Sequence, residues 1–337
     1  MSSILPANLG LDLVRATEAA ALSAGRWMGL GEPDQADRAA SQALANALHA
    51  LDIDGQIVIG EEGKLGWHSP LDSGQKVGRG LGLELDIVLD PIDGTRLLAI
   101  GHSDAISVIG AAPRGTMRSL HPAVYMEKII VDHQVAGSLV PECLDAPAAW
   151  VLGLVARVKK KAVHDLVVFV LDRPRHTHLV EEIRSAGARV VLRQEGDIAG
   201  ALAAAAHVDM DLLIGVGGAP EGVVTACAVK SLGGGMLARL APQSEAENEA
   251  IRLAGLDTRE IFTADDLVAG NEVFFAATGI TRGVLLDGVR FHGDQAETYS
   301  LVLRSKTKTQ RYIHTVHNLA LDFQAAQAKD RMADKDE

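Results

Sequence analysis

The sequence predicts an α/β protein with two domains, and three observations support this class. Hydrophobic residues make up 47% of the chain but aromatic residues only 4%, which is typical of small aliphatic side chains that pack helices onto a sheet. Strand-like and helix-like segments alternate beyond residue 165, which predicts a mostly parallel sheet with helical crossovers. The length of 337 residues is about twice that of a typical domain of roughly 150 residues, which favours two domains.

The N-terminal part is predicted to combine two helices with three strands. Apolar residues at helical spacing predict a helix over 11–29 that ends at Gly29. A second helix is expected after Asp34 or Gln35, with Asp37 in its first turn, where a carboxylate favours the helix dipole. Short apolar runs predict strands over 56–60, 84–90 and 104–112.

The pattern weakens between residues 140 and 163, where we place a domain boundary. The expected units are an N-terminal domain over 1–155, a C-terminal α/β domain over 156–325 and a polar tail over 326–337. Beyond the boundary, helices are expected to end near Gly187, to follow residue 193 and to begin near Pro220. Strands are expected over 165–171, 188–193, 209–217, 273–279 and 300–305.

The charge and the cysteines exclude several classes of protein. With 44 acidic and 32 basic residues, the chain has a net charge of −12, which argues against binding to nucleic acid or an anionic membrane. Cys143 and Cys227 have neither disulfide nor metal-ligand spacing, which indicates a reducing compartment. Because there is no signal-like N-terminus and no run of ~20 apolar residues, we expect a soluble cytoplasmic protein.

The most informative segment is LDIVLDPIDGT, residues 85–95. An apolar strand delivers Asp90 at its carboxyl end, Pro91 interrupts the ladder, and Asp93 precedes a turn at Gly94. Two carboxylates that point into one cleft repel each other unless a cation neutralises them. The segment therefore indicates a metal site, although an Asx turn in which Asp93 bonds the backbone fits it equally.

Further acidic residues lie beside other predicted strands. Glu61 and Glu62 directly follow IVIG (57–60), and open α/β sheets bind ligands at the carboxyl ends of their strands. Glu221 lies in GVGGAPEG (215–222), at the start of a helix. A solvated loop pair and a first-turn Glu that stabilises the helix dipole are the alternatives. Oxygen ligands alone select Mg²⁺ or Mn²⁺ rather than zinc.

The motifs occur in an order that resembles a known family. The segments, all between residues 57 and 281, are IVIGEE, DIVLDPIDGT, YMEKIIV, RPRH, GVGGAPEGVV and FAATGIT. They are similar to those of class II (GlpX-type) fructose-1,6-bisphosphatases, of the lithium-sensitive, metal-dependent sugar and inositol phosphatase superfamily. The resemblance implies a layered α/β/α/β/α fold and a homo-oligomer, either a dimer or a tetramer. It also implies Mg²⁺- or Mn²⁺-dependent removal of the 1-phosphate from fructose-1,6-bisphosphate, and in some members from sedoheptulose-1,7-bisphosphate.

Carried over by position, the functional residues of the family form two groups. The implied metal ligands are Asp37, Glu61, Asp90, Asp93 and Glu221, of which Asp37 and Glu61, together with Thr95, would take part in catalysis. The implied phosphate and sugar contacts are Gly94, Thr95, Tyr125, Arg173, Arg175, Glu195 and Asp197.

Several of these residues have an ordinary alternative. Arg173 and Arg175 follow a strand and suit a bidentate phosphate clamp, but the same spacing is common in solvated loops. Asp197 lies just before an alanine-rich helix and would serve equally as its N-cap. A second phosphate needs a cationic pocket of its own, for which Lys230 and Arg239 are further candidates.

The chain departs from the family pattern in three places. EEGKLGWHSP (61–70) lacks a second acidic pair, with Leu65 and Gly66 near its expected position. Asp93 stands where many members have Glu, and Pro33 replaces a basic residue. Two alternatives to the bisphosphatase therefore stay open. One is a phosphatase for another sugar or inositol phosphate, and the other is a weakly active paralogue that binds sugar phosphates as a regulator.

Overall fold

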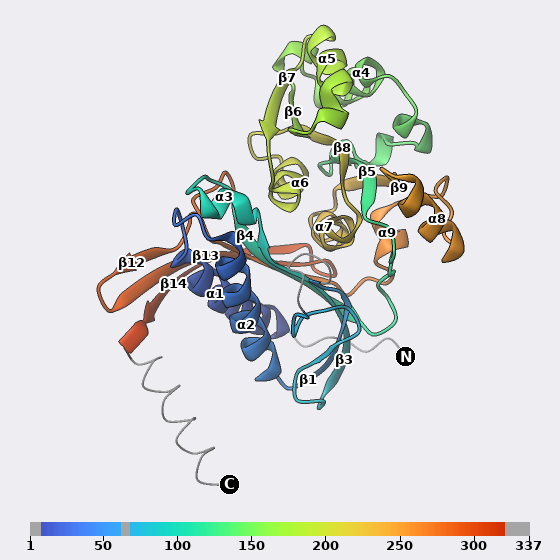
Figure 1. Cartoon of the computed structure of the whole chain (residues 1–337). Coiled ribbons are helices and arrows are strands. Elements are labelled where there is room, and N and C mark those ends of the chain that lie inside the picture. Colours follow the sequence, from blue (N-terminus) through green and yellow to red (C-terminus); the bar gives the residue numbers. More distant parts are fainter. Residues whose placement is uncertain (1–7, 62–67, 321–337) are drawn as a thin grey trace.

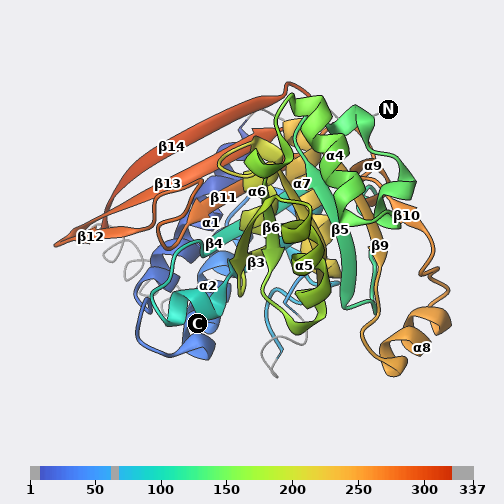
Figure 2. The same cartoon turned by 90° about the horizontal axis from the view of Figure 1, so that it is seen from above.

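The computed structural model of the protein describes residues 8–61 and 68–320, which form two mixed β-sheets surrounded by helices (Figure 1). The strands of the first sheet are β1 (Ile53–Ile59), β2 (Lys76–Val77), β3 (Leu83–Asp93), β4 (Ile106–Pro113), β11 (Phe274–Gly279), β12 (Arg290–His292), β13 (Gln295–Arg304) and β14 (Thr309–Asn318). Their order is β12-β13-β11-β4-β3-β1-β2, and β14 pairs with β13. Seen from above, β12 to β14 extend beyond the second sheet and its helices (Figure 2).

The second sheet comprises β5 (Tyr125–Val131), β6 (Val167–Leu171), β7 (Arg189–Arg193), β8 (Leu212–Gly218), β9 (Gly235–Leu240) and β10 (Ile261–Phe262). Its order is β10-β9-β5-β8-β6-β7. The prediction of a mostly parallel sheet is wrong, because only the β6–β7 and β6–β8 pairs are parallel here. Helical crossovers do keep β8 and β9 in one direction, but β5 inserts between them and runs antiparallel to both.

The helices form three layers, so the predicted α/β/α/β/α arrangement is confirmed. The outer face of the first sheet is covered by α1 (Leu9–Gly25) and α2 (Pro33–His49), and that of the second by α4 (Ala148–Lys159) and α5 (Thr177–Ser185). Between the sheets lie α6 (Asp197–Ala206) and α7 (Ala219–Leu232). The shorter elements are α3 (Thr95–Ala99), α8 (Glu245–Leu253), α9 (Ala264–Leu267) and the 3₁₀ turns η1 (Ala136–Ser138), η2 (Pro141–Leu144), η3 (Val163–Asp165) and η4 (Pro174–His176).

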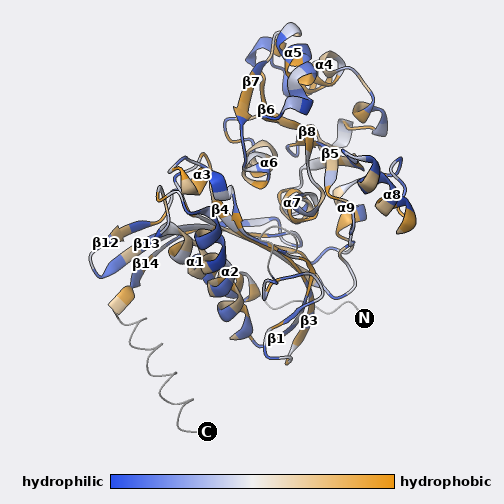
Figure 3. Cartoon of the chain, in the orientation of Figure 1, coloured by the Kyte–Doolittle hydropathy of each residue, from blue (hydrophilic) through white to orange (hydrophobic). Residues whose placement is uncertain are grey.

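The middle layer packs closely because its residues are small. Half of the buried positions of α6 are alanines, and Gly200 is a further small buried residue. A Cβ on Gly110 of β4 would lie 2.7 Å from the Sγ atom of Cys227 on α7, so this glycine sets how near the helix approaches the first sheet. Figure 3 shows the complementary pattern outside, where α2 and α8 carry hydrophilic residues. None of the helices within residues 8–61 and 68–320 combines the length and apolarity needed to cross a membrane.

Residue 155 does not separate the strands of the first sheet from those of the second. That position lies inside α4, whereas the chain leaves the first sheet after β4 and returns to it with β11. The segment from β11 to β14 therefore belongs with the N-terminal strands, because its antiparallel pairing with β4 completes their sheet. Whether the predicted units 1–155 and 156–325 are domains stays a prediction.

The helix boundaries differ from the predicted ones at the N-terminus. The first helix ends at Gly25 rather than Gly29, and Gly29 lies in a turn with φ 73° whose N–H donates to the carbonyl of Leu98. The second helix begins at Pro33, which lacks an N–H and is therefore suited to the first turn. Glu62, Leu65, Gly66 and the predicted tail over 326–337 lie outside the described residues.

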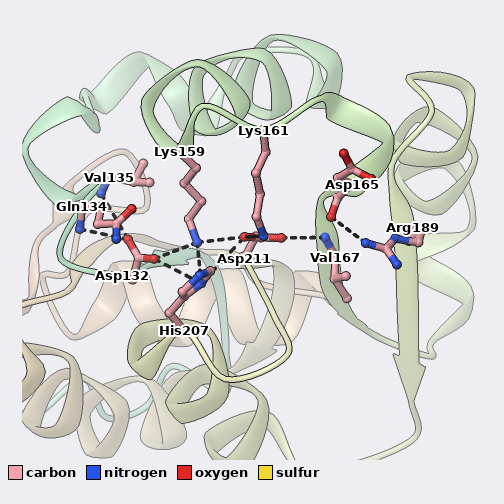
Figure 4. A network of polar contacts seen from close by, with 10 residues as sticks. All are labelled: Asp132, Gln134, Val135, Lys159, Lys161, Asp165, Val167, Arg189, His207 and Asp211. Atoms are coloured by element: carbon pink, nitrogen blue, oxygen red, sulfur yellow. Dashed lines mark hydrogen bonds and ion pairs between the residues drawn. The ribbon is translucent and has the colours of Figure 1, made fainter.

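A buried cluster of ion pairs lies at the start of β8 (Figure 4). The Nζ atom of Lys159 lies 2.7 Å from Asp132 and 2.9 Å from Asp211, and the Nζ atom of Lys161 lies 2.8 Å from Asp211. The imidazole of His207 approaches the same carboxylates. Because Asp211 also accepts the N–H of Val167 at 3.0 Å, the cluster ties the end of α4 to the beginnings of β6 and β8.

Candidate active site

Three of the predicted carboxylates lie at one edge of the first sheet. The parallel pairing of β1 with β3 brings the carboxyl ends of both strands to the same edge, as the sequence predicts. Glu61 follows β1, and Asp90 and Asp93 lie in the last four residues of β3. All three side chains are buried, with 2%, 4% and 5% of each residue exposed. Buried carboxylates need compensating partners, so this edge is chemically unusual.

Asp93 is the electrostatic centre of the site. Burial raises the pKa of Asp93 well above its usual range, and the negative charges of Asp90, Asp197 and Glu221 raise it further. The N–H of Ala199 donates to its Oδ2 atom at 3.0 Å and acts in the opposite direction. Carboxylates from the first sheet and from the helices between the two sheets therefore lie close together at this place.

Thr95 links α2 to the turn after β3. Its hydroxyl lies 2.9 Å from Oδ1 of Asp37 and 3.2 Å from the carbonyl of Ile92, and it donates to these acceptors. Gly94 precedes it with φ 95°, a conformation that side chains other than glycine rarely adopt. The tight turn thus presents the Thr95 hydroxyl to the mostly buried carboxylate of Asp37.

The second sheet contributes Glu195 and Asp197 near the start of α6. The backbone N–H of Arg96 donates to Oε2 of Glu195 at 2.9 Å, which joins α3 to the segment before α6. Asp197 is not the N-cap of its helix, because Gly196 occupies that position with φ 88°. Its carboxylate instead forms an ion pair with Lys128, so the alternative of an ordinary cap is excluded.

Lys128 is a site residue that the sequence interpretation missed. It lies on β5, its side chain is fully buried, and it also donates to the carbonyl of Gly218 at 3.3 Å. The signal was present in YMEKIIV, where Lys128 shares a face of the strand with Met126 and Ile130, both core residues between the sheets. A lysine on the buried face of a strand requires a charged partner.

The glycines of GVGGAPEG make room for charged side chains. A Cβ on Gly217 would collide with the Asp197 carboxylate and come within 2.9 Å of Lys128 Nζ. A Cβ on Gly218 would collide with the carboxylate of Glu221, which lies in the first turn of α7. The segment therefore allows close approach of backbone to carboxylates, which a side chain at either position would prevent.

Arg175 and Tyr125 lie together, while Arg173 precedes the 3₁₀ turn η4. The guanidinium of Arg175 is 4.9 Å from the ring centroid of Tyr125 and donates to the carbonyl of Val216 from Nε at 3.2 Å and from Nη2 at 2.8 Å. Burial lowers the pKa of Arg175, and the positive charge of Arg173 contributes in the same direction. One arginine of the predicted clamp is thus already fixed against β8.

The two additional candidates for a phosphate pocket lie elsewhere. Lys230 is in the last turn of α7, at the opposite end from Glu221, where it donates to the carbonyl of Val268 and pairs with Asp265. Arg239 pairs with Glu127 at 2.9 Å and with Asp145 at 2.8 Å. Each of these cations already balances a nearby carboxylate, and their assignment to the pocket stays a prediction.

The carboxylates fit a hard cation in chemistry and charge. Within residues 8–61 and 68–320, no three His, Cys, Asp or Glu side chains stand in an arrangement ready to hold a metal ion. The donors around Asp93 are nevertheless all oxygens, as Mg²⁺ and Mn²⁺ prefer. Burial first, and then the charges of neighbouring carboxylates, raise the pKa of Asp93, and a divalent cation would offset those charges. Metal binding by the five predicted ligands stays a prediction.

A layered α/β/α/β/α fold with a carboxylate-rich site between its sheets defines the broad class of this protein. Residues 7–317 match the model of the bacterial, glpX-encoded fructose-1,6-bisphosphatases. The chain is 40% identical over 325 residues to the fructose-1,6-bisphosphatase class 2 of Haemophilus influenzae, covering 92% of this chain and 96% of that protein. It is 36% identical over 326 residues to fructose-1,6-bisphosphatase 1 class 2 of Escherichia coli, covering 93% and 96%. The chain belongs to the GlpX family of bacterial fructose-1,6-bisphosphatases, and the predicted family is thereby confirmed.

Proposed function

We propose that this protein hydrolyses the 1-phosphate of fructose-1,6-bisphosphate, with Mg²⁺ or Mn²⁺, to fructose-6-phosphate and inorganic phosphate. The observation that carries the proposal is the set of buried carboxylates around Asp93, whose pKa is raised by burial and by its neighbours. Burying several carboxylates together destabilises the folded state, and a group of oxygen ligands of this kind suits the binding of divalent cations. The two curated relatives carry the name of this activity over almost the same length of chain.

The residues divide into those that would hold cations and those that would move a proton. Asp37, Glu61, Asp90, Asp93 and Glu221 would be the ligands, and bound cations would stabilise negative charge and lower the pKa of water. Thr95 and Asp37, joined by a 2.9 Å hydrogen bond, would orient that water and accept its proton. Hydrolysis of a phosphate monoester is very slow without catalysis, so charge stabilisation would supply most of the acceleration.

The sugar phosphate would lie between the two sheets. Glu195, just before α6, and Asp197, its first residue, border the site and offer acceptors for sugar hydroxyls, while Gly94 leaves the backbone open to the phosphate. Tyr125 and Arg175, with Arg173 nearby, form the cationic side of the site. Arginine suits phosphate because its planar guanidinium can donate two parallel hydrogen bonds to two phosphate oxygens.

A phosphate-release assay tests the proposal. Wild-type protein is assayed with Mg²⁺ or Mn²⁺ on fructose-1,6-bisphosphate, sedoheptulose-1,7-bisphosphate and inositol-1-phosphate. Asp90→Asn should abolish release, whereas Glu84→Gln, at the exposed start of the same strand, should retain it. Wild-type turnover by Asp90→Asn would refute the site. Release only from inositol-1-phosphate would favour the first alternative, and binding without release would favour the regulatory paralogue.

The sedoheptulose substrate and the homo-oligomer belong to the same proposal. The first is tested by the substrate panel above. The second, a dimer or a tetramer, is tested by light scattering of the purified chain across a range of concentrations, where a monomer at all concentrations would contradict it.

A further inference from the structure

The edge of β8 beside β6 loses its strand partner before the strand reaches the active site. On one side, β8 pairs with β5 along its whole length, from Leu212 to Gly218. On the other side, the register with β6 contains only Leu212 and Leu213. The backbone groups of Val216 point to this second side, and they are bonded by side chains instead of by a strand. The RPRH segment after β6 thus completes the ladder that β6 leaves open.

His176 and Arg175 provide these bonds. The N–H of Val216 donates to Nε2 of His176 at 2.8 Å, and the carbonyl of Val216 accepts from Arg175 Nη2 at 2.8 Å. His176 is 4% exposed, and its Nδ1 atom lies 2.7 Å from the carbonyl oxygen of Leu171, the last residue of β6. The imidazole therefore bridges the end of β6 to the middle of β8.

These partners determine the protonation state of the ring. A carbonyl oxygen only accepts, so Nδ1 must carry a proton, and a backbone N–H only donates, so Nε2 must carry none. His176 is therefore held as the neutral Nδ1–H tautomer. A second proton on Nε2 would abolish the bond to Val216 and oppose two N–H groups at 2.8 Å.

The bridge sets the position of the glycine segment. Gly215 has φ 139°, and a Cβ there would lie 3.0 Å from His176 Nε2, so the ring packs directly on the backbone before Val216. Immediately after Val216, Gly217 and Gly218 lie against the carboxylates of the site. A displacement of Val216 would therefore shift both this segment and the guanidinium of Arg175.

We propose that neutral His176 is a positioning residue that holds Val216, and through it Arg175 and the glycine segment, in the arrangement that binds the sugar phosphate. Protonation of the ring releases Val216 and weakens substrate binding, whereas the chemical step is affected little. The inference rests on the proposed function for its kinetic test, but the tautomer itself does not depend on any substrate.

The charges around His176 restrict the effect to acid pH. Burial lowers the pKa of the imidazole, and the cations Arg175 and Arg173 lower it further, while the bond to Leu171 and the charge of Asp197 act against this shift. Since the lowered pKa lies below the ordinary value of about 6.5, the bridge is intact at neutral pH. We expect KM to rise as the pH falls through this lowered pKa, on the acid side of the ordinary value, with kcat changing less.

Two matched variants separate a positioning role from a purely structural one. The longer side chain of His176→Gln carries its amide oxygen toward the Nε2 position, where it accepts from Val216 and cannot titrate. The shorter side chain of His176→Asn reaches only toward Leu171 and leaves the Val216 N–H unbonded. We expect KM to rise about tenfold in His176→Asn, as for a buried donor left without its partner, and to stay within about threefold of wild type in His176→Gln.

The pH profile and a spectroscopic measurement complete the test. His176→Gln should lose the rise in KM at acid pH. ¹⁵N NMR of the wild-type chain at pH 7, assigned by the loss of signal in His176→Gln, should show a proton on Nδ1 only. An unchanged KM in His176→Asn, an unchanged acid rise in His176→Gln, or a protonated Nε2 would each overturn the inference. Failure of the wild type to hydrolyse any sugar phosphate would refute the proposed function instead. In that case, calorimetric affinities for fructose-1,6-bisphosphate replace KM.

Discussion

Replacement of Lys128 by Met would leave Asp197 as an uncompensated carboxylate between the two sheets. Lys128 is fully buried, Asp197 is 7% exposed, and the two form an ion pair. Met fills a similar volume without the charge. Removal of one member of a buried pair costs about 3–5 kcal/mol, because the remaining charge stays desolvated. We expect Lys128→Met to be destabilised by this amount.

This free energy corresponds to a measurable change in melting temperature. An entropy of unfolding of about 2.1 cal/mol/K per residue, over 337 residues, gives about 0.7 kcal/mol per degree for cooperative unfolding of the whole chain. The expected decrease in Tm is therefore about 4–7 °C. Differential scanning calorimetry at pH 7 measures it.

Two further variants make the measurement decisive. The double variant Lys128→Met/Asp197→Asn removes both charges and should recover part of the lost stability, since the buried charge is gone. Arg15→Met breaks an exposed pair with Asp12 and should cost at most about 1 kcal/mol. If Lys128→Met melts at the wild-type temperature, or if the double variant is less stable than the single one, the reasoning on this pair is wrong.

Three other predictions concern the site and the acid stability of the fold. Gly218→Ala places a methyl group against the Glu221 carboxylate and should lower kcat/KM by about 100-fold through misplacement of that carboxylate; an unaltered phosphate-release rate would contradict it. Thr95→Val removes the hydroxyl bonded to Asp37 and should reduce kcat by about 100-fold or more, with unchanged Tm as the control for folding. Burial alone would raise the pKa of Asp211, but hydrogen bonds from two lysines and an amide lower it overall. The stabilisation by Asp211 is therefore fully present above the unfolded pKa of about 3.9 and is lost as the pH falls through the lower folded pKa. Urea titrations should show that the difference in free energy of unfolding between wild type and Asp211→Asn decreases below pH 4.

Local patterns in the sequence were sufficient to predict that acidic residues lie at one edge of the first sheet. An apolar run that ends in an acidic residue predicts a buried strand with a carboxylate at its end, and β1 and β3 both have this form. Their shared edge follows from the parallel pairing, and it agrees with the expectation that acidic residues at the carboxyl ends of two strands in one sheet form one site.

These local patterns could not predict which strands pair when they are far apart in the sequence. The placement of β5 between β8 and β9, antiparallel to both, depends on contacts that form only when the chain is folded. For the same reason, the local patterns did not specify the return of β11 to β14 to the first sheet. Lys230 and Arg239 were assigned to a phosphate pocket by charge alone, but their partners in space are local acids.

The sequence by itself determined the family, the α/β class and the residue types that gather at the strand ends, because these depend on local order along the chain. Only the tertiary structure decided how the charges are balanced. It pairs Lys128 with Asp197 across two elements, adds Asp197 and Glu221 to the field at Asp93, and uses His176 where β6 ends. The physical reason is that electrostatic and hydrogen-bond energies depend on distances of a few ångströms between atoms, and such distances are set by packing and not by separation in sequence.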